Sequence, residues 1–306
     1  MSLYLKYRPQ NLEEVKGNAD IKSSLTSLLS KREDCPHSFL LYGPTGCGKT
    51  TMARIIANML DCKGSDYREI DSADYRGIDM VREVRKLSGF KPIESKCRVW
   101  VLDECHKMSN DAQNALLKIL EDTPKHVYFI LCTTDPKKLI ETIIGRCTLL
   151  QVKPLSDPQM LSLLKRITRE EGSRIDQEVY DIIVNDCKGR PRNAIQKLEL
   201  VLNVGKDQQL EIAKQAEVEQ AQAIDLCRAL MKKSGWGEIS RILRGLKESE
   251  INAEDVRRLA MAYFSAIVIK SDNRRAGLIL EMFNDPFYDT GFPQLVLTCY
   301  LIYNEK

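Results

Sequence analysis

The residues best suited to chemistry form the run GPTGCGKT at positions 43–50, which fits the pattern G-x-x-x-x-G-K-[ST]. An apolar run precedes it and a helical pattern follows it. Glycines let such a loop fold so that successive backbone N–H groups point at a polyphosphate, and the helix N-terminus adds its dipole. Lys49 then reaches the terminal phosphates, and the Thr50 hydroxyl binds Mg²⁺. We therefore predict phosphate contacts from Gly43, Pro44, Thr45, Gly46, Cys47, Gly48, Lys49, Thr50 and Thr51.

An acidic pair, Asp103 and Glu104, follows the apolar run VWVL. A buried strand would deliver Asp103 to its carboxyl end, where a carboxylate can hold Mg²⁺ and its water shell. Glu104 comes next and would orient or deprotonate a water that attacks the terminal phosphate. Taken with the phosphate loop, this pair predicts hydrolysis of a nucleoside triphosphate, with Thr50 and Asp103 as the magnesium ligands.

The elements that must position these groups follow from the apolar pattern. Short β-branched or aromatic runs alternate with helical segments up to about residue 152, which predicts an α/β core with a mostly parallel sheet covered on both faces. The predicted strands are SFLLY, YREID, VWVL, YFILC and TLLQV, and the helices between them include 50–60 and 111–121. After Pro154 the strand pattern stops, and three short helices are predicted at 157–172, 176–189 and 191–205. Long amphipathic helices follow, so the predicted domains are 1–153, 154–206 and 207–306.

Composition narrows the class of protein further. The chain has 306 residues and a formal net charge of +3, so contacts with nucleic acid would need a local cluster of Lys and Arg. None of the ten cysteines forms a C-x-x-C pair, which predicts reduced, mostly buried thiols and no zinc. The chain starts without a signal peptide and has no apolar run near 18 residues, which predicts a cytoplasmic protein with no membrane span.

A longer stretch then resembles a known family. VWVLDECHKMSNDAQNALLKILEDTPKHVYFILCTTDPKKLIETIIGRC, with KYRP near the start and RGIDMVREV at 76–84, is similar to the AAA+ ATPase core of sliding-clamp loader subunits. The likeness is to the bacterial gamma/tau subunit and to the small subunits of replication factor C. It implies ATP and Mg²⁺ as ligands, a three-helix lid and a helical collar for oligomerisation. The implied partners are a sliding clamp, primed double-stranded DNA and other loader subunits in a homo- or hetero-oligomeric, pentameric ring. The compact length suggests a viral or phage loader, which would act in the host cytoplasm.

The resemblance also assigns roles in ATP hydrolysis. Thr134 would be sensor 1, a polar group that reads the γ-phosphate, and Arg192 would be sensor 2 in the lid. Arg146 would be an arginine finger that acts on ATP held by a neighbouring subunit, although Gly145 replaces the serine of the family's Ser-Arg-Cys pattern. Lys118 would be a second basic residue that reaches across the same interface. Residues near the adenine would be Tyr7, Arg8, Pro9 and Val15.

Contacts with DNA and clamp follow from the same likeness. The helix that opens at Gly77 and Ile78, flanked by Arg76 and Arg82, would lie against DNA phosphates. An apolar tip after this helix would touch the clamp through Leu87 and Phe90, although both could instead pack onto their own domain.

Three alternatives stay open at this point. The DECH sequence at 103–106 is typical of DEAD/DExH helicases, but these need a second strand-containing domain, so His106 is interpreted as an incidental residue at a helix entry. Another AAA+ machine, such as a helicase loader or branch-migration ATPase, would share the core. An ATPase-inactive structural subunit of a loader would lack some of the catalytic groups that this chain retains.

Overall fold

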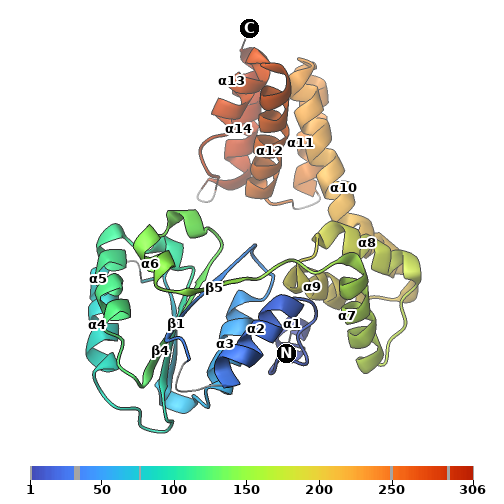
Figure 1. Ribbon diagram of the computed structural model, residues 1–306. Coiled ribbons are helices and arrows are strands. Elements are labelled where there is room, and N and C mark those ends of the chain that lie inside the picture. The colour runs from blue at the N-terminus through green and yellow to red at the C-terminus, as the bar shows by residue number, and fades with distance from the viewer. Residues whose placement is uncertain (1, 31–34, 76, 249–250, 288–289, 306) are drawn as a thin grey trace. The chain divides into compact units, whose positions relative to one another are not determined.

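The computed structural model describes residues 2–30, 35–75, 77–248, 251–287 and 290–305 (Figure 1). The chain divides into two compact units, Met1–Gln209 and Leu210–Lys306. The predicted boundary near residue 206 lies close to this division, and the further division of the first unit at residue 153 stays a prediction.

A five-stranded parallel sheet forms the centre of the first unit, in the order β2-β3-β4-β1-β5. All five predicted strands are confirmed, and β3 and β4 are buried almost throughout because helices cover both faces. The strands are β1 (Ser38–Tyr42), β2 (Tyr67–Asp71), β3 (Arg98–Asp103), β4 (Val127–Thr133) and β5 (Thr148–Gln151).

Helices and short 3₁₀ turns connect these strands, close to the predicted positions. The helices of the first unit are α1 (Leu3–Lys6), α2 (Ala19–Ser30), α3 (Lys49–Met59), α4 (Ile78–Ser88), α5 (Asn110–Glu121), α6 (Glu141–Gly145), α7 (Asp157–Glu170), α8 (Gln177–Cys187) and α9 (Pro191–Leu202). The 3₁₀ turns are η2 (Gly64–Asp66), η3 (Cys105–Lys107) and η4 (Pro136–Lys138).

Alternation along the strands separates two hydrophobic clusters. Phe39 and Leu41 of β1 pack in the cluster with α2 and α3, whereas Leu40 between them packs in the cluster with α4, α5 and α6. All three side chains are fully buried, as the two-residue period of a strand covered on both faces requires. The two helical layers are visible on either side of the strands in Figure 1. This packing fixes the carboxyl edge of the sheet, from which the phosphate loop starts.

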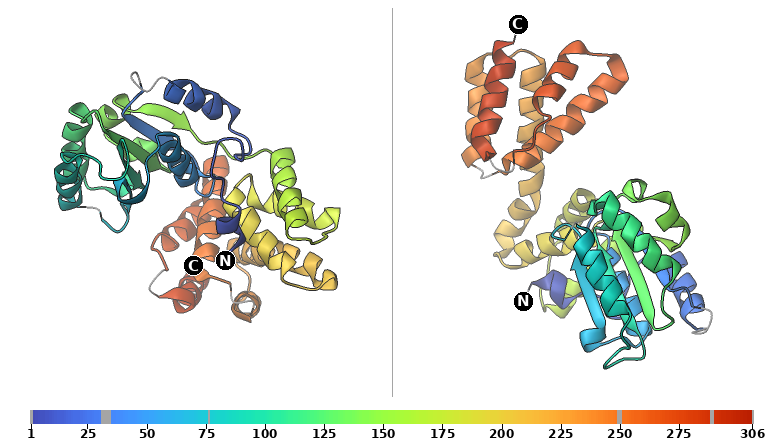
Figure 2. Two further views of the ribbon diagram at one scale, coloured as in Figure 1. Left: turned by 90° about the horizontal axis from the view of Figure 1, so that it is seen from below. Right: turned by 90° about the vertical axis from the view of Figure 1, so that its left-hand side faces the viewer.

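The helices α7, α8 and α9 pack against one another as a small bundle after β5. Ser156 and Gln159 form a capping box that starts α7, and Pro191 occupies the first turn of α9, where its missing N–H costs nothing. The N-terminal helix α1 packs on α9, where the Ser2 hydroxyl donates a 2.6 Å hydrogen bond to Glu199; both views of Figure 2 show α1 beside these helices. The N-terminal segment thereby connects the bundle to the sheet domain.

The second unit contains helices only, among its described residues. Its core contains the buried rings of Phe264, Phe283 and Phe287. The ring centroids of Phe264 and Phe283 are 6.4 Å apart, and those of Phe283 and Phe287 are 6.1 Å apart. None of the described helices is long and apolar enough to span a bilayer. The helices that follow α9 are α10 (Lys206–Met231), α11 (Trp236–Glu248), α12 (Ala253–Ser271), α13 (Arg274–Met282) and α14 (Gly291–Asn304).

Candidate nucleotide site

The phosphate loop lies between β1 and α3, as predicted. Gly43 and Gly46 have φ values of 151° and 77°, and a Cβ at Gly43 would lie 2.1 Å from the Val152 carbonyl oxygen. Only glycine fits both the backbone angle and the space there. Gly48 precedes α3 with no side-chain cap, so the first N–H groups of this helix are available to an anion. The buried Lys49 ammonium donates hydrogen bonds to the carbonyl oxygens of Gly43 and Pro44, at 3.0 and 3.2 Å.

A hydroxyl and a carboxylate meet beside this loop. The Thr50 hydroxyl donates a 2.6 Å hydrogen bond to Asp103 Oδ2, although the two residues are 53 positions apart in the chain. The connection arises because α3 starts at the carboxyl end of β1 and Asp103 ends β3, at the same edge of a parallel sheet. Hard oxygen ligands of these two types suit Mg²⁺. The predicted magnesium ligands are thus neighbours in space.

Glu104 lies at the start of η3 with a left-handed backbone, φ 47° and ψ 39°. Such a conformation is uncommon for a residue other than glycine and occurs often at functional sites. Its Oε2 accepts a 3.2 Å hydrogen bond from the Thr134 hydroxyl, so the predicted sensor 1 touches the predicted water-activating group. His106 Nδ1 lies 3.2 Å from the same oxygen.

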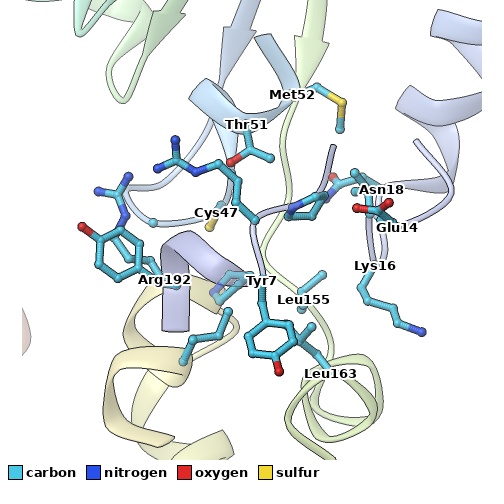
Figure 3. A pocket seen from close by; sticks show the side chains of 18 of the residues that line it. Tyr7, Glu14, Lys16, Asn18, Cys47, Thr51, Met52, Leu155, Leu163 and Arg192 are labelled. Carbon is cyan, nitrogen blue, oxygen red and sulfur yellow. The ribbon is translucent and has the colours of Figure 1, made fainter. Parts of the chain in front are cut away.

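A pocket beside the phosphate loop collects the residues predicted to surround the adenine. Tyr7, Arg8, Pro9 and Val15 all line it, together with loop residues that include Gly46 and Thr51. Figure 3 shows side chains from the N-terminal segment, the phosphate loop and the α7–α9 bundle around one hollow. A second hollow joins Thr45, Lys49, Thr50, Asp103, Glu104 and Arg192. The chain therefore places an apolar recess next to a phosphate-binding loop.

Arg192 lines both hollows, and its backbone N–H donates a 3.3 Å hydrogen bond to the Gly46 carbonyl oxygen. It lies in the first turn of α9, where the helix dipole disfavours a cation. Burial lowers the pKa of Arg8 from its ordinary value, and the nearby charges of Arg54 and Arg192 lower it further. An anion in the pocket would relieve this concentration of positive charge.

Arg146 lies at the opposite edge of the sheet. It follows α6 and precedes β5, and it shares a surface depression with Ser38 at the start of β1. One guanidinium nitrogen donates to the Glu121 carboxylate and another to the Thr142 carbonyl oxygen at 3.2 Å. The length of β1 separates this edge from the phosphate loop by about 15 Å. Arg146 is thus exposed and outside the pocket of its own chain.

Lys118 and Arg82 also lie outside that pocket. Both line a groove between α4 and α5, which places Lys118 next to the predicted DNA-contacting helix. That helix, α4, begins at Ile78 after Gly77 with no side-chain cap, so its first N–H groups are open to an anion. Arg76 lies outside the described residues.

The two residues predicted to touch a clamp differ in exposure. Phe90 is 58% exposed, whereas Leu87 is partly buried and packs against the α4–α5 side of the core. Ile93, which sequence analysis did not single out, is 80% exposed in the same loop. The apolar surface of this loop therefore consists of Phe90 and Ile93.

Several pocket residues escaped sequence analysis because they belong to no short motif. Leu155, Leu163 and Ile195 come from the β5–α7 connection and the α7–α9 bundle, where an apolar pattern predicts only packing. Glu14, Lys16, Asn18 and Met52 also line the pocket. His106 was interpreted as incidental, yet its ring touches Glu104.

The ten cysteines all lie within the described residues, none of them in a disulfide, and nine of them are buried. Burial raises the pKa of Cys147 and Cys227 to about 12, so these thiols stay protonated. No group of three or more His, Cys, Asp or Glu side chains among the described residues is arranged to hold a metal ion.

Comparison with known proteins finds similarity to subunits of DNA polymerase III. The profile of a family described as "DNA polymerase III, delta subunit" matches residues 65–156. The DNA polymerase III gamma/tau subunit of Mycobacterium tuberculosis is 35% identical over 225 residues, which cover 66% of this chain and 39% of the relative. The tau subunit of Bacillus subtilis is 33% identical over 227 residues, covering 67% and 40%. The tau subunit of Escherichia coli is 28% identical over 298 residues, covering 87% and 46%. The chain thus spans less than half of these relatives' lengths.

Among solved structures, the Holliday junction branch migration motor RuvB of Thermotoga maritima superposes with a TM-score of 0.59. The sequence identity is 21%, and the match covers 71% of this chain and 78% of that chain. This likeness shows the fold, a five-stranded parallel sheet flanked by helices and followed by helical domains.

Proposed function

We propose that this chain, which is similar to the gamma/tau subunits of bacterial DNA polymerase III, is an ATPase subunit of a sliding-clamp loader. ATP binding favours a clamp-opening assembly on primed DNA, and hydrolysis releases the closed clamp, because the two states differ in their affinity for ATP. The partners are a sliding clamp, primed double-stranded DNA and other loader subunits.

One observation supports this proposal most directly: the two halves of a hydrolytic site lie at opposite edges of one sheet. Lys49, Thr50, Asp103 and Glu104 converge at the carboxyl edge, whereas Arg146 is exposed at the amino edge. In a head-to-tail assembly, Arg146 of one copy would then enter the hydrolytic site of its neighbour. Hydrolysis then depends on assembly, which is what a loader needs.

The residues present fit MgATP. Mg²⁺, held through Thr50 and Asp103, would neutralise charge on the β- and γ-phosphates. Lys49 would exchange its carbonyl partners for phosphate oxygens, and the first N–H groups of α3 would bind the same phosphates. Arg192, on α9, would contact the γ-phosphate. The position of the α7–α9 bundle would then depend on the bound nucleotide.

Contacts with the other partners would involve α4, α5 and the loop that follows α4. The start of α4 at Gly77 and Ile78, with Arg82 beside it, would bind DNA phosphates. Lys118 would assist Arg146 across the subunit interface. Phe90, with Leu87 packed behind it, would enter an apolar recess on the clamp.

The direct test is Arg146→Ala, assayed with clamp and primed DNA. ATP binding should stay within about twofold of the parental value, while stimulated hydrolysis should fall roughly 10³-fold, the lower end of the range for an arginine finger. Lys137→Ala, which removes an exposed lysine from η4, is the matched control and should hydrolyse ATP at the parental rate. Parental turnover by an assembled Arg146→Ala protein would refute the assignment.

A further inference from the structure

Glu104 is held by two side chains at a single oxygen. Its Oε2 accepts from the Thr134 hydroxyl at 3.2 Å and lies 3.2 Å from His106 Nδ1. The contact with His106 is possible because Glu104 starts the turn η3, which brings the side chain two positions later back towards its carboxylate. The imidazole side chain is only 10% exposed, so it has little freedom to turn away.

The surroundings decide which nitrogen of His106 carries the proton. Nδ1 also lies 3.1 Å from the Thr133 hydroxyl, which itself accepts a 3.0 Å hydrogen bond from the Asp135 N–H. An ionised carboxylate can only accept, so a bare Nδ1 would direct its lone pair at a negative charge. A protonated Nδ1 instead donates to Glu104, with the Thr133 oxygen as a second acceptor. The geometry therefore selects the tautomer with hydrogen on Nδ1.

The surroundings of the His106 ring determine whether it is charged or neutral. Burial lowers the pKa of His106, and Lys138 and Lys107 lower it further. Glu104 and Asp135 act in the opposite direction and do not reverse the shift. Since the shift takes the pKa below the ordinary value of about 6.5, the ring is neutral at pH 7.5 and carries a single N–H.

We propose that His106 is a positioning residue for Glu104, whose Oε2 it holds so that the other carboxylate oxygen faces the attacking water. The proposal rests on the ATPase function proposed above. Among the described residues, none donates a hydrogen bond to Oε1 of Glu104, so that oxygen is available to a water. In the reaction, the water oxygen bonds to the γ-phosphorus as the bond to the ADP oxygen breaks, and the proton of the water passes to Glu104. His106 touches neither water nor phosphate.

This role predicts an effect on the rate and not on nucleotide affinity. His106 does not line the pocket formed by Lys49, Thr50, Asp103 and Arg192, so its removal leaves the phosphate contacts intact. Without it, the Thr134 hydroxyl is the one side-chain donor among the described residues that still bonds to the Glu104 carboxylate. A general base typically raises the rate of a reaction roughly 10²- to 10⁴-fold, and a base that is held loosely gives a smaller rate increase.

Three substitutions separate hydrogen-bond position from packing. His106→Asn places an amide N–H near the position of Nδ1, His106→Gln places it near that of Nε2, and His106→Leu removes it. With clamp and primed DNA, kcat should fall about 10- to 100-fold in the Leu and Gln variants and less than about threefold in the Asn variant. The KM for ATP should stay within about twofold in all three. Equal rates in all variants, or an Asn variant as slow as the Gln variant, would overturn the proposal.

A second measurement does not depend on ATP turnover. The chain has three histidines, so ¹⁵N resonances of the His106 ring can be assigned by substituting the other two. At pH 7.5 the spectrum should show a neutral ring with hydrogen on Nδ1, and Glu104→Ala should shift that nitrogen. A ring with hydrogen on Nε2, or a charged ring, would overturn the proposal. Absence of ATP turnover in the parental chain would instead refute the proposed function, so the two failures are distinguishable.

Discussion

The two edges of the parallel sheet are built for opposite tasks. At the carboxyl edge, glycines and an uncapped helix leave backbone N–H groups facing inward, with Lys49 and Asp103 between them. At the amino edge, Arg146 and Phe90 face outward. One edge forms a recess and the other presents side chains, and in the proposed assembly Arg146 of one copy would enter the recess of its neighbour.

A buried ion pair and its hydrogen bonds hold the loop at the amino edge. The fully buried Asp66 accepts hydrogen bonds from the N–H groups of Ile93, Glu94 and Ser95, at 2.7–3.0 Å. Arg98 pairs with Asp66 at 3.1 Å and donates to the carbonyl oxygens of Leu87, Phe90 and Lys91. His126 adds a 3.1 Å contact to the Phe90 carbonyl oxygen. The loop that exposes Phe90 and Ile93 is therefore preorganised, which lowers the entropy cost of binding a partner.

The largest expected effect tests whether the two edges cooperate between chains. Lys49→Ala removes the lysine of the phosphate loop, and Arg146→Ala removes the exposed arginine at the amino edge. Each protein alone should lose stimulated hydrolysis roughly 10³-fold. Mixed in equal amounts, they should regain activity, because about a quarter of head-to-tail interfaces then join an intact recess to an intact arginine. ATPase assays of the mixture with clamp and primed DNA measure this.

The double variant Lys49→Ala/Arg146→Ala, mixed with either single variant, controls for weak recovery by other routes. In those mixtures no interface joins an intact recess to an intact arginine. A mixture of the two single variants that stays inactive after subunit exchange would show that Arg146 does not act across an interface.

The next effect is on stability, at the amino edge. Asp66→Asn leaves the buried Arg98 without its ion-pair partner and should cost about 3–5 kcal/mol in the free energy of unfolding. Burial raises the pKa of Asp66, but hydrogen bonds from the backbone N–H groups of Glu94, Ile93 and Ser95 and from Arg98 outweigh it, so the net pKa is lowered. The carboxylate thus contributes stability above its ordinary pKa, near pH 4, and this is lost as pH falls further.

Urea unfolding at several pH values measures both effects. Asp79→Asn is the matched control, because its ion pair with Arg82 is exposed and should contribute no more than about 1 kcal/mol. If the two variants unfold at the same urea concentration, the Asp66–Arg98 pair does not hold the amino edge.

The difference between the two edges also explains which features could be predicted from the sequence. The carboxyl edge was predictable because GPTGCGKT and VWVLDE combine chemistry and local structure within a few residues, and the apolar pattern located all five strands. The contact between His106 and Glu104 was not, because it depends on the left-handed turn at Glu104. The exposure of Ile93 depends on a hydrogen bond to Asp66, which lies 27 positions away in the sequence. A hydrophobic pattern along the chain does not predict a contact over that separation. The apolar lining from the α7–α9 bundle is likewise a product of tertiary packing.

A smaller effect concerns the apolar residues at the amino edge. Phe90→Ser should weaken binding to the clamp about tenfold, since a central exposed aromatic residue typically contributes 1–2 kcal/mol to an interface. ATP hydrolysis without clamp should not change. Leu200→Ser is the matched control, since Leu200 is 60% exposed, close to the 58% of Phe90, and lies on α9. Equal clamp affinity in the two variants would remove this loop from the interface.

The smallest expected effect concerns DNA, where helix α4 presents both its uncapped N-terminus and Arg82. Arg82 pairs with Asp79 at 2.8 Å, but both side chains are exposed, so DNA phosphates can compete for the guanidinium at little cost. Arg82→Gln should weaken binding to primed DNA only a few-fold and lower the slope of log affinity against log salt by about one, as the loss of one phosphate contact requires. Arg244→Gln, an exposed arginine on α11, changes the net charge equally and should leave the slope unchanged. Since only a direct phosphate contact separates these two variants, equal slopes would show that Arg82 acts through overall charge and that the start of α4 does not lie on the DNA.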